Sequence, residues 1–250
     1  MRIYLDNNIF VYLEQKKIEI SDLEDLVVGK FSKIFFSPAH VQETLEIKGQ
    51  TDNQRNDWIN QRLNLISQIT RNYYLHEGLD NIISEYVESP FEVYKTITEV
   101  SFAQDSMKDL ANLVDEESRE ESRKALGIES RKISNFGPED LINELDKVFA
   151  ALGMNSFQNF LETSIKFHPD YKKFGLSNRI AALFETLDIL GYCKDKFNEK
   201  SNYARQWDSN HCSFASACDV FISNDKKMIN KAKVAFQVYK VETKIIYSNI

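Results

Sequence analysis

Both ends of the chain alternate short apolar runs with helical patterns. Near the start, residues 2–5 (RIYL) and 33–37 (KIFFS) are candidates for buried strands, and each precedes a helical pattern. Near the end, residues 219–223 (DVFIS) precede the helical pattern KKMINKAK, and two more strand candidates follow, FQVYKV and KIIYS. Strands that alternate with helices form parallel sheets with right-handed crossovers. The sequence therefore predicts an α/β fold in which helices flank a parallel sheet.

The middle of the chain carries helical patterns instead. Residues 53–70 have an apolar stripe at helical spacing, and Arg55 and Arg62 are expected on the opposite, polar face. The stripe consists of Trp58, Ile59, Leu63, Ile66 and Ile69. Residues 77–200 are predicted to be mostly helical, with Pro138 in the first turn of one helix and Gly153 after its end. We therefore expect a single domain, residues 1–250, interrupted by a helical insertion at residues 77–200.

Composition narrows the class of protein. Three cysteines without a CxxC pair predict free thiols in a reducing compartment. No apolar run approaches the ~18 residues of a membrane helix, so a cytoplasmic protein without membrane contact is expected. A net charge of −7 argues against a general binder of polyanions, because long-range attraction to phosphates needs clustered positive charge. Contact with nucleic acid would then be local.

Four acidic residues follow or flank the predicted strands. Asp6 directly follows RIYL, and Glu43 lies in the first turns of the helix after KIFFS. Asp225 lies two residues past DVFIS, and Asp208 precedes SNHCSFASA, which is expected to be a helix that packs closely on the sheet. Functional groups of parallel sheets gather at the carboxyl ends of the strands. We therefore expect Asp6, Glu43, Asp208 and Asp225 to converge at one edge.

Converging carboxylates repel one another unless cations neutralise them. Oxygen-rich sites without soft ligands favour Mg²⁺ or Mn²⁺, and pairs of such ions ~3.5–4 Å apart recur in enzymes that hydrolyse phosphodiesters. The pattern therefore predicts a metal-dependent hydrolase that acts on a polyanion by in-line attack of an activated water.

At these residues the chain resembles the PIN domain family of metal-dependent nucleases, many of which are toxins or RNA-processing enzymes. The similarity lies in YLDNNIF, SPAHVQETLE and DSNHCSFASACDVFISNDKKM, over roughly residues 1–75 and 203–247. The resemblance implies a PIN-like sheet and an endoribonuclease whose acidic quartet is Asp6, Glu43, Asp208 and Asp225, with Ser223 as a supporting hydroxyl. Asn7 is expected to support the site as well, although it stands where a hydroxyl is common, and the span from Glu43 to Asp208 exceeds that of compact relatives.

Several partners are implied as well. RNA is the favoured substrate, and the side chains of Arg205, Lys226 and Lys227 are candidates for contact with its phosphates. A protein antitoxin or regulator and a homodimer are partners that such folds also use, although no motif in this chain identifies an interface.

Each acid also has an ordinary structural interpretation. Asp6, Asp208 and Asp225 are all suited to cap helices, and Glu43 suits a solvated helix face. A phosphatase of the haloacid-dehalogenase type also begins with an Asp after its first strand, but it needs a second acid where this chain has Asn8. The remaining alternative is a catalytically inactive PIN-like scaffold that binds RNA or protein.

Overall fold

The structure, a computed structural model, describes residues 1–27, 31–99, 116–194 and 199–249, of which residues 199–205 are described as backbone. The chain divides into two compact units. Unit 1 comprises Met1–Gln104, Phe214–Lys226 and Glu242–Ile250, and unit 2 comprises Asp105–Ser213 and Lys227–Val241. The predicted insertion at residues 77–200 thus overlaps unit 2 from residue 105 onward, whereas its first part belongs to unit 1.

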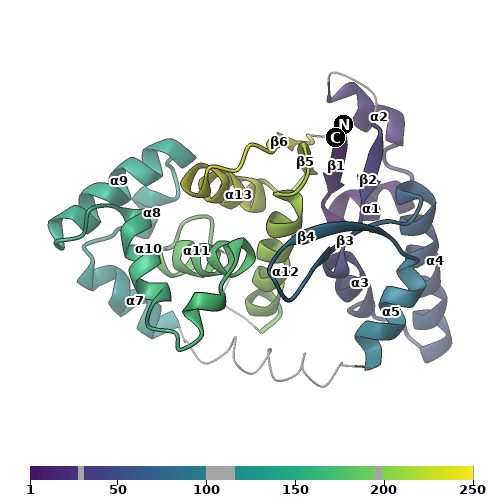
Figure 1. Cartoon of the computed structure of the whole chain (residues 1–250), viewed down its shortest axis with the longest axis horizontal. Coiled ribbons are helices and arrows are strands. Elements are labelled where there is room, and N and C mark those ends of the chain that lie inside the picture. The colour runs from purple at the N-terminus through teal and green to yellow at the C-terminus, as the bar shows by residue number, and fades with distance from the viewer. Residues whose placement is uncertain (28–30, 100–115, 195–198, 250) are drawn as a thin grey trace. The chain divides into compact units, whose positions relative to one another are not determined.

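Unit 1 is an α/β unit that joins both ends of the chain (Figure 1). Its elements are β1 (Arg2–Leu5), α1 (Asn7–Glu14), α2 (Ile20–Asp25), β2 (Lys33–Phe35), α3 (Pro38–Leu45), α4 (Asp52–Thr70), β3 (Tyr73–Glu77), β4 (Ile83–Val87), α5 (Pro90–Glu99), β5 (Val220–Ser223) and β6 (Lys244–Tyr247). In Figure 1 the purple strands β1 and β2 lie beside the yellow-green β5, although about two hundred residues separate them. The strands RIYL, KIFFS, DVFIS and KIIYS are therefore confirmed, to within a residue or two at their ends.

The main sheet has the order β2-β1-β5-β6, and every pair in it is parallel. Ile3 of β1 pairs with Ile34 of β2 on one side and with Val220 of β5 on the other. The predicted parallel α/β sheet flanked by helices is thus present. This register places the carboxyl ends of β1 and β5 next to each other, because Leu5 pairs with Ile222.

One face of this sheet packs on helices. Ile3 and Leu5 alternate along β1 and join Ile9, Leu63 and Ile66 in the buried core. Each fully buried side chain of this kind stabilises the fold by roughly 1.5–3 kcal/mol relative to exposure. The helical stripe predicted at residues 53–70 accounts for α4, with the exception that Trp58 is 40% exposed.

The hairpin of β3 and β4 was not predicted, because residues after 77 were expected to be mostly helical. β3 and β4 pair antiparallel, from Tyr73 with Val87 to Glu77 with Ile83. A parallel bridge between Phe36 and Tyr74 attaches β3 beyond β2. The turn residues Gly78–Asn81 were the available signal: Asn81 adopts a positive φ of 60°, which asparagine tolerates better than most residues.

Unit 2 is helical. It contains α7 (Glu116–Ala125), α8 (Ser130–Ile133), α9 (Pro138–Ala151), α10 (Phe157–Ile165), the 3₁₀ turn η1 (Tyr171–Lys173), α11 (Leu176–Leu190) and most of α12 (Glu199–Ala215) and α13 (Lys226–Tyr239). Pro138 begins α9 as expected, and Gly153 has a positive φ of 83° just after that helix. No helix among the described residues combines the length and the apolar character needed to cross a membrane.

Two predicted boundaries near the end of the chain are wrong. FQVYKV was expected to be a strand, but α13 continues to Tyr239, because Ile229, Ala232 and Phe236 keep a buried face at helical spacing. α12 begins at Glu199 rather than after Asp208, so Asp208 lies inside the helix and does not cap it. The segment before Asp208 contains neither proline nor glycine, and nothing in it ends a helix.

Candidate active site

Asp6 stands at the junction between β1 and α1. Its backbone is extended, with φ −64° and ψ 153°, and its Oδ1 accepts a hydrogen bond from the Asn7 backbone N–H at 2.8 Å. Asp6 therefore does cap α1, as its ordinary structural interpretation predicts. The side chain is only 4% exposed, and its second oxygen, Oδ2, has other partners.

Ser223 connects Asp6 to Asp225. Its hydroxyl donates to Asp6 Oδ2 at 2.6 Å and accepts the backbone N–H of Asp225 at 3.0 Å. Asn8 Nδ2 donates to the same Asp6 oxygen at 3.4 Å. A helix cap alone does not need a hydroxyl from another strand. The parallel pairing of β1 and β5 is what brings these residues, more than two hundred positions apart, onto one hydroxyl.

The helix that carries Glu43 is joined to the end of β1 by a buried histidine. Glu43 is half-buried on α3, one turn after the fully buried His40. His40 Nδ1 accepts the backbone N–H of Ser37 at 3.0 Å, and His40 Nε2 lies 2.7 Å from the carbonyl oxygen of Leu5. Since a backbone N–H can only donate, Nε2 carries the proton and donates to Leu5. His40 thus ties the start of α3 to the end of β1, and both ring nitrogens are engaged.

The charges of Asp6 and Glu43 both contribute to the pKa of the Tyr4 hydroxyl. The hydroxyl lies 2.6 Å from Ser37 Oγ inside the fold. Burial raises the pKa of Tyr4 well above its ordinary value; the hydrogen bond to Ser37 opposes the rise, and the charges of Asp6 and Glu43 add to it. Asp6, just after β1, and Glu43, on α3, thus both contribute to the raised pKa of Tyr4.

Two arginines that were expected on a polar face instead support this site. Arg62 is 6% exposed; its Nη1 donates to Asn7 Oδ1 at 3.4 Å, and its Nη2 forms an ion pair with Glu14. Arg55 donates to the carbonyl oxygens of Leu45 and Ile47 at 2.9 and 3.1 Å, so it satisfies the end of the helix that carries Glu43.

The burial of Arg62 was visible in the sequence. Ile59, Arg62, Leu63 and Ile66 follow the i, i+3, i+4, i+7 spacing of a buried helix face, and all four are buried. The assignment of Arg62 to the wet face of α4 was therefore wrong. Asn7 was predicted to support the site. Its backbone N–H donates to Asp6 Oδ1, and its side-chain oxygen accepts a hydrogen bond from Arg62.

The remaining predicted residues divide between the units. Asp225 is half-buried, and Lys226 next to it is exposed at the start of α13. Asp208, half-buried in α12, and Lys227, whose Nζ donates to the Lys194 carbonyl oxygen at 3.0 Å, belong to unit 2. The side chain of Arg205 lies outside the described residues. The structure thus brings Asp6, Ser223 and Asp225 together, places Glu43 on the helix that His40 joins to the end of β1, and leaves Asp208 in the other unit.

The donor atoms of the Asp6 cluster suit a hard cation. They are the Asp6 carboxylate oxygens and the Ser223 hydroxyl oxygen, and Mg²⁺ is often held by only one or two carboxylates together with waters. Across the part of the chain that the structure describes, no group of three or more His, Cys, Asp or Glu side chains is arranged to hold a metal ion.

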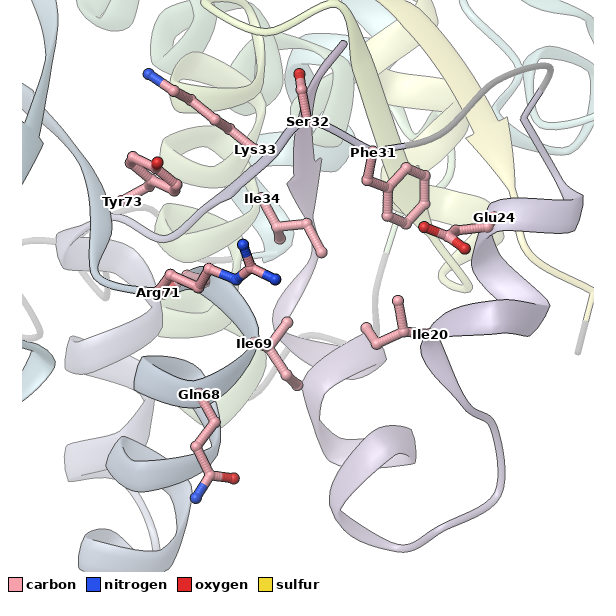
Figure 2. Close-up of a pocket in the computed structure, with 11 residues that line it drawn as sticks. Ile20, Glu24, Phe31, Ser32, Lys33, Ile34, Gln68, Ile69, Arg71 and Tyr73 are labelled. Carbon is pink, nitrogen blue, oxygen red and sulfur yellow. The ribbon is translucent and has the colours of Figure 1, made fainter.

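A hollow of about 340 Å³ lies at the opposite edge of the sheet, where β2 begins (Figure 2). Figure 2 shows the Arg71 guanidinium pointing toward Ile34 and the carboxylate of Glu24 facing Phe31. Lys33 at its rim pairs with Glu85. β1 and β2 are parallel, so this hollow is at the amino ends of the strands and contributes nothing to the Asp6 cluster.

No family model, curated protein or solved structure matches this chain. The similarity to the PIN domain family therefore stays a prediction from the quoted motifs. Asp6, Ser223 and Asp225 are the predicted site residues that contact one another.

Proposed function

We propose that this protein is a metal-dependent endonuclease with a PIN-like fold, acting on RNA. The observation that carries the proposal is the convergence of Asp6 and Asp225 on the hydroxyl of Ser223, at the carboxyl ends of two neighbouring parallel strands. The Asp6 carboxylate and the Asp225 backbone N–H meet at this hydroxyl, and two acidic residues brought together from distant parts of the chain are candidate ligands for Mg²⁺ or Mn²⁺.

Each residue has a distinct role in the proposal. Asp6 and Asp225 hold the ion, and Glu43 orients a water or contributes to a second ion. Ser223 and Asn8 fix the Asp6 carboxylate by donating to Oδ2. Lys226, exposed beside Asp225, contacts a substrate phosphate. When bound, the divalent ion would lower the pKa of an attacking water and stabilise the leaving oxygen.

The proposal also includes Asp208, Arg205 and Lys227, whose roles are predicted from the sequence. Asp208 completes the acidic quartet that the family resemblance implies, and Arg205 and Lys227 are further phosphate contacts. Asp208→Asn tests the first of these directly: a loss of cleavage as large as that of Asp6→Asn supports a shared site, and unchanged cleavage removes Asp208 from it.

The decisive experiment compares the wild-type protein with Asp6→Asn on single-stranded RNA, single-stranded DNA and duplexes, in Mn²⁺, Mg²⁺ or EDTA. The wild type is expected to cleave RNA only in the presence of metal, and Asp6→Asn is expected to lose more than about a hundredfold of that activity. Asp57→Asn, a change at an exposed acid of α4, is the matched control and keeps full activity. RNA binding without cleavage by all proteins would instead identify the inactive scaffold.

A measurement without substrate tests the metal site separately. Ligands that bind only the folded state raise the midpoint of thermal unfolding. Mn²⁺ is expected to raise that midpoint in the wild type and in Asp57→Asn, and to have a smaller effect in Asp6→Asn and Asp225→Asn. Equal shifts in all four proteins would refute metal binding at Asp6.

A further inference from the structure

The β3–β4 hairpin exposes an unusual amount of apolar surface. Of the eight large hydrophobic side chains that are exposed in the described residues, four lie on or next to it: Leu79, Ile82, Tyr86 and Val87. Leu79 is fully exposed, and Val87 is 72% exposed. β4 pairs with β3 on one side, and no other described strand pairs with it. Clustered exposed apolar side chains of this kind indicate an interaction surface.

A hollow of about 580 Å³ lies beside the hairpin, between it and α5; we call it the hairpin pocket. Three rings from one face of the hairpin line it. Tyr74 and Tyr86 are direct partners across the two strands, and His76 lies two residues beyond Tyr74. The rings of Tyr74 and His76 stack at 6.0 Å, and those of His76 and Tyr86 meet edge to face at 6.2 Å. Val93 and Ile97 of α5 form an apolar wall.

The charges of the hairpin pocket are negative. Glu88 and Glu92, both exposed, line it, and neither Lys nor Arg is among its lining residues. The Glu88 charge reaches the rings: burial, assisted by Glu88, raises the pKa of Tyr74 to about 12. The carboxylates would repel a phosphate and attract a cation, and aromatic faces bind cations through their quadrupoles. Rings and carboxylates therefore favour the same kind of ligand.

We propose that the hairpin pocket binds the guanidinium or ammonium group of an arginine or lysine side chain presented by a partner protein. Apolar residues flanking that basic side chain would cover the exposed part of the Tyr86 ring and Ile82, which is exposed in the turn of the same hairpin. A segment of alternating basic and apolar residues would match both the negatively charged aromatic pocket and the exposed apolar side chains. RNA bases could stack on the aromatic rings, but the RNA phosphates would be repelled by the carboxylates. This inference does not depend on the nuclease activity, because the pocket contains none of the proposed catalytic residues.

The test is a methyl NMR titration of the full chain with the peptide acetyl-Leu-Arg-Leu-amide. Saturable shifts of the Val93 and Ile97 methyl groups are expected. The peptide with citrulline in place of arginine keeps the shape and loses the charge, and we expect it to bind about tenfold more weakly. Hexauridylate tests the alternative ligand: shifts of the same methyl groups by this RNA, in place of the peptide, would overturn the proposal.

Variants test whether the peptide binds in the hairpin pocket. Glu88→Gln/Glu92→Gln is expected to weaken the arginine peptide about tenfold, and Tyr86→Leu to weaken it as well. Glu117→Gln/Glu121→Gln, at two exposed acids of unit 2, changes the net charge equally and should leave the affinity unchanged. Equal affinity for the arginine and citrulline peptides, or no saturable shift, would refute the proposal. RNA cleavage by Glu88→Gln/Glu92→Gln is expected at the wild-type rate, so the two proposals fail independently.

Discussion

Asp6 in unit 1 and Asp188 in unit 2 are both buried, with 4% and 2% of their surface exposed, yet they are stabilised differently. Asp6 accepts hydrogen bonds from neutral donors: Ser223, Asn8 and the Asn7 backbone. Asp188 on α11 forms an ion pair with Arg119 of α7 and lies 3.6 Å from Lys231 of α13, and both cations are themselves buried.

The difference separates a structural carboxylate from a candidate functional one. Cations of the chain itself compensate Asp188, so its charge links three helices of unit 2 and is directed inward. Three neutral donors orient the Asp6 carboxylate, and hydrogen bonds of this kind fix the orientation of carboxylates that bind an external cation. Asp188 lies in an apolar helical segment of the sequence, which suits either a buried partner of a basic group or an additional residue of the site, and the structure shows the former.

The largest effect is expected from breaking the Asp188 cluster. Arg119→Met leaves a buried carboxylate with one fewer cation, and it should lower the free energy of unfolding by about 3–5 kcal/mol in urea denaturation. The triple variant Arg119→Met/Asp188→Leu/Lys231→Met should recover most of that loss, since apolar residues can replace a buried ion cluster.

The control for this prediction is Glu185→Gln. Glu185 also pairs with Arg119, but it is 45% exposed, so less than about 1 kcal/mol is expected. A loss from Arg119→Met as small as that of Glu185→Gln would show that the buried pair contributes no more than a surface one.

Ser223→Ala should have a smaller effect on stability and a larger one on function. The change removes the donor to Asp6 Oδ2 and the acceptor of the Asp225 N–H, which costs about 1–3 kcal/mol. RNA cleavage is expected to fall about 10–100-fold, as for residues that orient metal ligands. Ser223→Thr keeps the hydroxyl and should retain more activity than Ser223→Ala. Equal activities of the two variants would count against the orienting role.

Alkaline pH distinguishes the buried hairpin tyrosine from an exposed one. The pKa of Tyr74 is raised to about 12 in the folded state, against about 10 in an unfolded chain. Its stabilising contribution is therefore complete below pH 10 and is lost as the pH rises through 12. Tyr74→Phe should lessen the fall of unfolding free energy between pH 10 and 11, whereas Tyr247→Phe, at an exposed ring, should not. An unchanged fall in Tyr74→Phe would contradict the shift.

The smallest effect concerns thiol reactivity. Burial raises the pKa of Cys218 in unit 1 to about 12, and it raises that of Cys212 in unit 2 well above the ordinary value. Cys193 in unit 2 is only half-buried. At pH 8 we expect Cys193 to react first with a disulfide reagent, and Cys193→Ser to abolish the fast phase. A fast phase that persists in Cys193→Ser would contradict this order.

Much of unit 1 was predictable because its signals are local. Alternation of apolar runs and helical periods identified β1, β2, β5 and β6, and acids at strand ends identified Asp6 and Asp225. The incorrect predictions also concern local signals, which were present in the sequence but were misread. The helical period of α13 was cut short at FQVY, the Gly78–Asn81 turn was overlooked, and Arg62 was placed by its charge although its spacing put it on the buried face.

The sequence by itself determined that apolar strands alternate with helices and that acidic residues follow those strands, because periodicity and punctuation are properties of neighbouring residues. Only the tertiary structure decided which of these residues meet. The hydrogen bond between Ser223 and Asp6 spans 217 positions and exists because β1 and β5 pair in one particular register. Such pairing depends on packing of the whole sheet, and no local pattern encodes it.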